Sequence, residues 1–100
     1  MRFEKGNAVN RPDTGEFHGF LKFLGKGDLS ARLRAEEDAY KRAIPGEVAF
    51  YCYEVKYKVS AMDNGLLFEV KYKMGTKRGT APVVLWGKEE TFTVQIKFWQ

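Results

Sequence analysis

Two stretches decide the fold, and they read YEVKYKV at residues 53–59 and FEVKYKM at residues 68–74. In each, apolar or aromatic side chains alternate with charged ones, which is the period of a strand with one buried and one solvent-facing side. The same period returns in residues 91–98. Asp63-Asn64-Gly65 between the first two stretches is typical of a turn. The pattern predicts an antiparallel sheet with one face buried and one wet face, that is, a face exposed to solvent.

A fourth, shorter strand is expected at residues 81–86, and Gly87-Lys88 after it has the composition of a turn. Short connections between successive strands predict a four-stranded antiparallel β-meander. Near the start of the first strand, over residues 48–53, both sides are apolar. That change predicts cover on both faces there, for which the N-terminal segment, residues 1–13, is available as an extended arm.

The clearest helix is predicted at residues 29–44. Asp28 is a suitable N-cap, and Pro45-Gly46 would end the helix. Leu29, Leu33 and Tyr40 fall on one face of it. The sequence thus predicts one α+β domain over residues 1–100, with helices on one face of the sheet.

Residues 14–24 fit two structures. Phe17, Phe20, Leu21 and Leu24 lie at helical spacing, Asp13 and Glu16 form a capping-box pattern, and Gly25 suits a helix end. The alternative is a strand with Phe17, Leu21 and Phe23 on one side. The helix is favoured.

Bulk properties restrict the class of protein. One hundred residues make one domain, and the net charge of +4 permits nucleic acid or an acidic protein as partner. The single cysteine, Cys52, excludes an internal disulfide and favours a reducing, cytoplasmic location. No signal peptide or membrane-spanning run is present in the sequence. With His18 as the only histidine, no metal site and no cofactor are expected.

Lysines gather on the wet face of the predicted sheet, and strand register decides how basic that face is. The residues concerned are Lys56, Lys58, Lys71, Lys73 and Lys97, with Glu54 and Glu69 among them. A two-residue Asn64-Gly65 loop would oppose lysine to lysine twice, which is destabilising without a bound anion. A loop from Met62 to Gly65 pairs Lys58 with Glu69 and Glu54 with Lys73, and it leaves only Lys56 against Lys71. This second register is preferred. In it, the lysines need not form a binding site, because a sheet face of paired charges can simply protect the protein from aggregation.

Two further features are candidate binding elements. The loop from Gly75 to Thr80 carries Lys77 and Arg78 and could hold a phosphate, or it could be a plain polar hairpin loop. Trp86 and Trp99 are expected on the face away from Phe92, where they could stack on a base or anchor a protein. Alternatively, Trp99 fills a gap beneath the N-terminal arm.

Glu36 falls on the Leu29/Leu33/Tyr40 face of the long helix. A carboxylate against the core could act as a general acid or base, in a pocket completed by His18, Tyr51, Cys52 and Tyr53. Alternatively, Arg32 four residues earlier pairs with it at the edge of that face.

Three hypotheses of function follow. The leading one is a non-enzymatic binding protein of the inhibitor or accessory type, docking on nucleic acid or on an acidic or nucleoprotein surface through Lys56, Lys71, Lys73, Lys77, Arg78, Lys97, Trp86 and Trp99. The second is a small-ligand or enzymatic pocket between helix and sheet around Glu36 and the tyrosines. The third is a homo-oligomer that uses a strand edge or the Trp99 patch as its interface.

Overall fold

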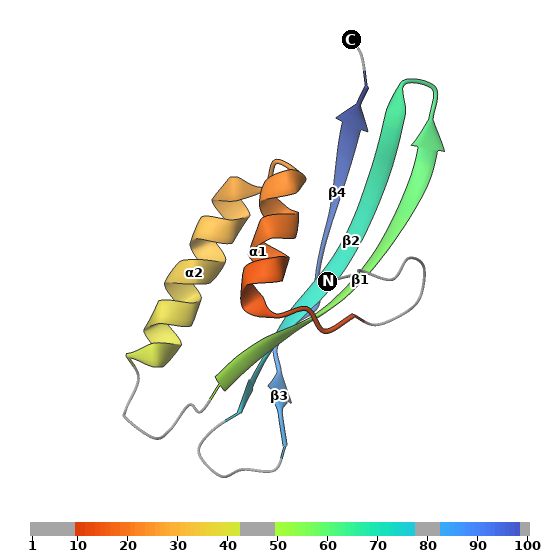
Figure 1. The fold of residues 1–100 in the computed structure, drawn as a ribbon. Coiled ribbons are helices and arrows are strands. Elements are labelled where there is room, and N and C mark those ends of the chain that lie inside the picture. The colour runs from red at the N-terminus through yellow and green to blue at the C-terminus, as the bar shows by residue number, and fades with distance from the viewer. Residues whose placement is uncertain (1–9, 43–49, 78–82, 99–100) are drawn as a thin grey trace.

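The computed structural model describes residues 10–42, 50–77 and 83–98, and there two helices cover one face of a four-stranded antiparallel sheet (Figure 1). The predicted α+β class is confirmed. Within these ranges, no helix has the length and apolar character that crossing a membrane requires.

The first helix, α1, spans Thr14–Phe23 and begins with the predicted capping box. The Asp13 carboxylate accepts a hydrogen bond from the Glu16 backbone N–H (2.8 Å), and the Glu16 carboxylate accepts one from the Asp13 N–H (3.4 Å). Gly25, with φ 74°, follows the helix. The strand alternative is wrong: Leu21 is fully buried, whereas Phe23, which a strand would place on the same side, is 68% exposed.

The second helix, α2, spans Gly27–Lys41 and starts two residues before the predicted position. Its N-cap is Lys26, which makes no side-chain capping bond, so the prediction of Asp28 as N-cap is wrong. The reason is the tight link from α1. The Lys26 N–H bonds the Leu21 carbonyl while the Lys26 carbonyl already accepts from the Ser30 N–H. Asp28 lies in the first turn, where its negative charge interacts favourably with the positive end of the helix dipole. The predicted end of this helix, residues 43–44, lies outside the described residues.

Strands β1 (Phe50–Met62) and β2 (Gly65–Lys77) form a long hairpin in the predicted register. Val59 pairs with Phe68, and Asp63-Asn64 makes the turn.

The strands β3 (Leu85–Trp86) and β4 (Glu90–Lys97) lie end to end along the other edge of β2. Gly87-Lys88 therefore does not reverse the chain as a hairpin turn would, and the described strands do not follow one another as a simple meander. The Gly87 N–H bonds the Met74 carbonyl (2.7 Å), so the chain stays beside β2. The pairing shifts by one residue between β3 and β4, as at a β-bulge.

The core lies between the helices and the inner sheet face, by which we mean the face toward α1 and α2. Its buried apolar members are Phe17, Leu21, Leu24, Leu29, Leu33, Tyr53, Val55, Phe68, Val70 and Tyr72. The molecule measures 51 × 25 × 23 Å, and the β1–β2 hairpin extends beyond the helices (Figure 1). Both helices lie on the inner face (Figure 1), and on the opposite sheet face, the outer face, side chains such as Lys56, Lys71 and Thr93 are exposed to solvent.

The N-terminal segment enters the described part of the chain beside β1. Asn10 and Val55 exchange two backbone hydrogen bonds of 2.9 Å, so Asn10 occupies the outer edge of β1 at that point. The rest of the predicted arm, residues 1–9, lies outside the described residues.

Candidate functional site

The outer face owes its charge pattern to the β1–β2 register. Lys58 lies opposite Glu69, Glu54 lies opposite Lys73, and Lys56 lies directly opposite Lys71. This is the register that the sequence favoured. It leaves one pair of like charges facing each other, at the centre of the hairpin.

The Lys73 end of this face is held by an ion-pair network around Glu54. The guanidinium of Arg11 donates to Glu54 Oε1 through Nε (3.0 Å) and Nη2 (2.6 Å), and Lys73 Nζ lies 3.5 Å from Glu54 Oε2. One carboxylate thus serves two cations, and the network keeps a net positive charge. Arg11 comes from the N-terminal segment, so its role depends on a tertiary contact that periodicity does not reveal.

Trp86 lies beside this network, on the outer face as predicted. It sits directly opposite Gly75, and a Cβ built on that glycine would meet the indole ring at 2.7 Å. The ring therefore packs over the backbone of a strand position that has no side chain, an arrangement known to stabilise glycine in a sheet. Arg11 and Lys73 lie 5.7 and 5.0 Å from the centre of the ring, within the range of cation–π attraction. Trp86 is half-buried and already has these contacts in the free protein.

A shallow groove crosses the middle of the outer face. We call it the lysine groove; its volume is about 490 Å³, and its lining includes Lys56, Lys58, Lys71, Thr91, Thr93, Glu69 and Glu89. The groove thus brings together the ammonium groups of three lysines, the hydroxyls of two threonines and the carboxylates of two glutamates. Among the described residues, neither Lys56 nor Lys71 has an ion-pair partner within 4.0 Å.

The remaining predicted site residues do not gather at the lysine groove. Lys97 shares the outer face but pairs with Gly65, six residues along β2 from Lys71, which places it about 20 Å away. Lys77 ends β2 at the opposite end of the sheet. Arg78 and Trp99 lie outside the described residues. The lysines share the outer face but do not gather at one point of it, because Lys97 at the end of β4 pairs with the start of β2, whereas Lys71 and Lys73 lie further along β2.

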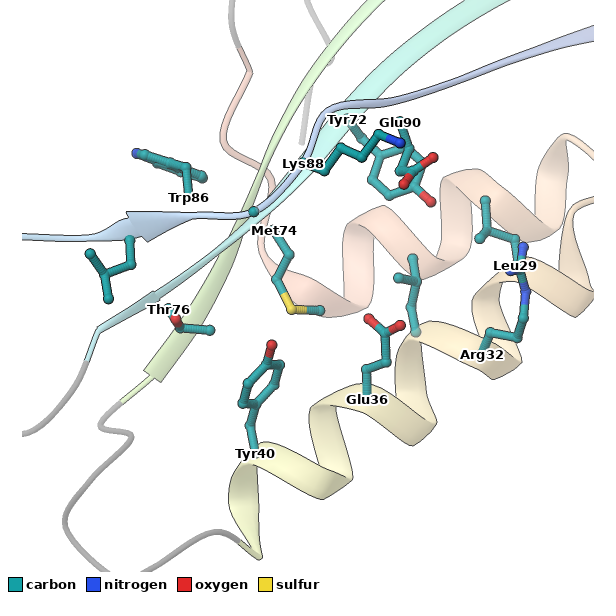
Figure 2. A pocket seen from close by; sticks show the side chains of 13 residues that line it. Leu29, Arg32, Glu36, Tyr40, Tyr72, Met74, Thr76, Trp86, Lys88 and Glu90 are labelled. Atoms are coloured by element: carbon teal, nitrogen blue, oxygen red, sulfur yellow. The ribbon is translucent and has the colours of Figure 1, made fainter.

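The other side of the sheet has a pocket of about 440 Å³ between α2, β2 and the β3–β4 segment. Figure 2 shows Glu36 and Tyr40 facing Met74 and Thr76 across it. Tyr72 also lines it. The hypothesis of a buried Glu36 is wrong, since this residue is exposed on the rim. Tyr51 and Tyr53 are not among the described lining residues.

The buried carboxylate is Glu37, the next residue. His18 Nε2 lies 2.8 Å from Glu37 Oε2, the Tyr53 hydroxyl donates to the same oxygen (2.5 Å), and His18 Nδ1 lies 2.6 Å from Ser30 Oγ. These four residues, which we call the buried polar cluster, are each 3% exposed or less. A neutral imidazole protonated at Nε2 can make both of its contacts at once.

The buried polar cluster has the residue types of a serine–histidine–carboxylate relay, but its burial assigns it a structural role. Nothing reaches Ser30 from solvent, so no substrate can approach its hydroxyl. Burial, together with the hydrogen bond to Glu37 and the charge of that residue, raises the pKa of Tyr53 well above its usual value. The cluster joins α1, α2 and β1.

Sequence reasoning missed this cluster because the apolar face of the predicted helix was drawn through Leu29, Leu33 and Tyr40, and Glu37 was not assigned to it. A signal was present: Ser30, Leu33 and Glu37 are spaced at i, i+3 and i+7, and all three are buried. Two polar residues at such spacing could have indicated a polar stripe that needs partners. Among the described residues, no buried side-chain nitrogen or oxygen lacks a hydrogen-bond partner.

In the described ranges, no group of three or more His, Cys, Asp or Glu side chains is placed to hold a metal ion. No protein-family model matches the chain, and comparisons with curated proteins and with solved structures found no match.

Proposed function

We propose that this chain is a non-enzymatic binding protein whose lysine groove docks on the phosphate backbone of nucleic acid. The observation that carries the proposal is the direct opposition of Lys56 and Lys71. Like charges opposed across a strand pair cost free energy in the free protein. A phosphate between the two ammonium groups would turn this repulsion into two charge-assisted contacts.

The surroundings of the pair support an anionic ligand. Glu54, the nearest carboxylate along β1, is engaged by Arg11 and Lys73, and Glu69 lies opposite Lys58. The exposed hydroxyls of Thr91 and Thr93 add neutral donors on the β4 side of the groove. Lysine and threonine side chains commonly contact phosphates, and such contacts fix position without reading sequence.

The test is fluorescence anisotropy with labelled single-stranded and duplex oligonucleotides over a series of salt concentrations. Log affinity should fall linearly with log salt, and the double variant Lys56→Gln/Lys71→Gln should reduce the slope by about 1.4 to 1.8. The matched control, Lys22→Gln/Lys88→Gln, removes the same charge from exposed positions off the lysine groove. It should leave the slope close to that of the parent protein.

Two results would contradict the nucleic-acid proposal. One is the absence of binding to either oligonucleotide at about 50 mM salt. The other is equal loss of affinity in the groove variant and the control variant, which would mean that net charge alone drives binding. Salt-sensitive capture by an acidic protein, without oligonucleotide binding, would assign the same groove to an acidic protein surface.

A second candidate function is small-ligand binding in the pocket of Figure 2, favoured by its mixed lining. Leu33 and Met74 give it an apolar floor, while Arg32 and Glu36 place opposite charges on its rim. Such a combination suits a small zwitterionic ligand. A thermal-shift screen of amino acids and nucleotides, repeated on Glu36→Gln, tests it; no shift with any ligand would remove this candidate.

A further inference from the structure

The two edges of the sheet differ in how well they are protected. On the β1 edge, Asn10 pairs with Val55 through two backbone hydrogen bonds. On the other edge, β4 pairs only with β2 in the described part of the chain, and Figure 1 shows it along the rim of the sheet. An unpaired strand edge is a template for another strand unless a charge, a proline or a bulge blocks it.

None of these blocking features occurs in the central part of β4. Residues 91–96 contain no charge and no proline, and their pairing with β2 is continuous. Phe92, Val94 and Ile96 are half-buried on the inner face and pack against the core, while Thr91 and Thr93 are exposed on the outer face. A strand added here would extend both faces of the sheet.

We propose that this edge pairs, antiparallel, with β4 of a second copy of the chain, about a two-fold axis that passes midway between the Thr93 residues of the two copies. In this register Thr93 faces its own counterpart, Thr91 faces Gln95, and Phe92 faces Val94. Threonine pairs and apolar pairs stabilise adjacent strands. The occupant is a second copy because the strand is complementary to itself.

Charge complementarity selects the register. With Thr93 on the axis, Glu89 of one copy lies opposite Lys97 of the partner subunit, once at each end of the contact. Both residues are exposed; Glu89, directly before β4, lines the lysine groove, and the alternation of β4 places Lys97 on the same outer face. Moving the axis to Val94 would place Lys97 opposite Thr91 and lose both ion pairs. Glu90 faces Ile96 in the proposed register, and its exposed side chain keeps the carboxylate in water.

The pairing has a consequence for the lysine groove, and this consequence alone rests on the proposed function. Glu89 lines the groove and opposes its positive charge. When Lys97 of the partner subunit neutralises Glu89, the groove becomes more basic, and the two outer faces form one continuous surface. Dimerisation should then increase affinity for a polyanion.

The first experiment is sedimentation equilibrium, in which a dimer has twice the 11.5 kDa mass of one chain. Thr93→Lys places two like charges face to face on the axis and should give monomers. The control Gln95→Lys makes the same change on the same face, opposite Thr91, and should preserve the dimer. Glu89→Lys should weaken the dimer, and the double variant Glu89→Lys/Lys97→Glu should restore it.

The second experiment reports the register directly, in a Cys52→Ala background. Facing residues of antiparallel strands have Cα atoms about 4.5 to 5.5 Å apart, within the span of a disulfide. Thr93→Cys should therefore form a disulfide-linked dimer on mild oxidation, whereas Gln95→Cys should not. A mass of 11.5 kDa at every concentration, or dimers indifferent to Thr93→Lys, would overturn the proposal. Either result leaves the oligonucleotide test of the lysine groove intact, because that test measures binding to the monomer as well.

Discussion

The Nε2 atom of His18 lies 2.8 Å from Oε2 of Glu37, and this contact joins α1 to α2 inside the core. The Tyr53 hydroxyl donates to the same carboxylate oxygen and adds β1 to the junction. Two helices and a strand of the sheet therefore depend on one carboxylate. A buried polar network of this kind stabilises only while every member has its partner.

Glu37→Ala should strongly destabilise the protein, because it leaves buried polar groups on His18 and Tyr53 without a partner. We expect a loss of about 3 kcal/mol in the free energy of unfolding, measured by urea denaturation. The neighbouring Glu36→Ala is the matched control; its side chain is exposed, and it should change stability by less than about 0.5 kcal/mol. Equal effects of the two substitutions would contradict the assignment of the buried carboxylate.

Stability should decline in alkaline solution because the pKa of Tyr53 is raised in the folded state. Between the unfolded pKa, near 10, and the higher folded pKa, the unfolded chain binds fewer protons. The contribution of Tyr53 is thus fully present below about pH 10 and is lost as pH rises above it.

Tyr53→Phe tests this dependence. Urea midpoints at about pH 9 and about pH 11 should differ less in this variant than in the parent protein. Some decline should persist, because burial also raises the pKa of Tyr72. Tyr40→Phe, at an exposed position, should retain the full difference between the two midpoints.

Gly75→Ala should destabilise the β2–β3 pairing. The added methyl group would lie 2.7 Å from the Trp86 ring and 2.6 Å from a Val84 methyl, so the indole must leave its place over the strand. We expect a loss of about 1 to 3 kcal/mol and a change in tryptophan fluorescence. Gly19→Ala is the control: it has open space in the middle of α1 and should stabilise the protein by up to about 1 kcal/mol.

Lys56→Glu should stabilise the free protein by about 0.5 kcal/mol, because it replaces a repulsive pair with an attractive one opposite Lys71. Lys58→Glu makes the same change two residues away but opposes Glu69, and it should destabilise by a similar amount. Both effects should shrink at high salt, since exposed charges are screened. Effects of the same sign in thermal melts at low salt would contradict the register.

Much of the sheet could be predicted from the sequence. Side chains alternate with a period of two, so an error of one residue would expose Val55 and bury Lys56. Among the registers that keep this alternation, the favoured one places opposite charges across from each other. That register, with Lys58 opposite Glu69, is confirmed. The capping box at Asp13 and Glu16 likewise identified the start of α1, because each partner is local in the sequence.

The tertiary structure alone decided which glutamate is buried, what covers Trp86 and which lysines share a groove. Glu36 and Glu37 differ by about 100° around one helix, and only the position of α1 determines which of them meets His18. Arg11 reaches Glu54 and Trp86 across 43 and 75 positions of sequence. The periodicity of a sequence predicts on which face of its own helix or strand a side chain lies. It carries no information on which distant element lies there, because that depends on how the whole chain packs.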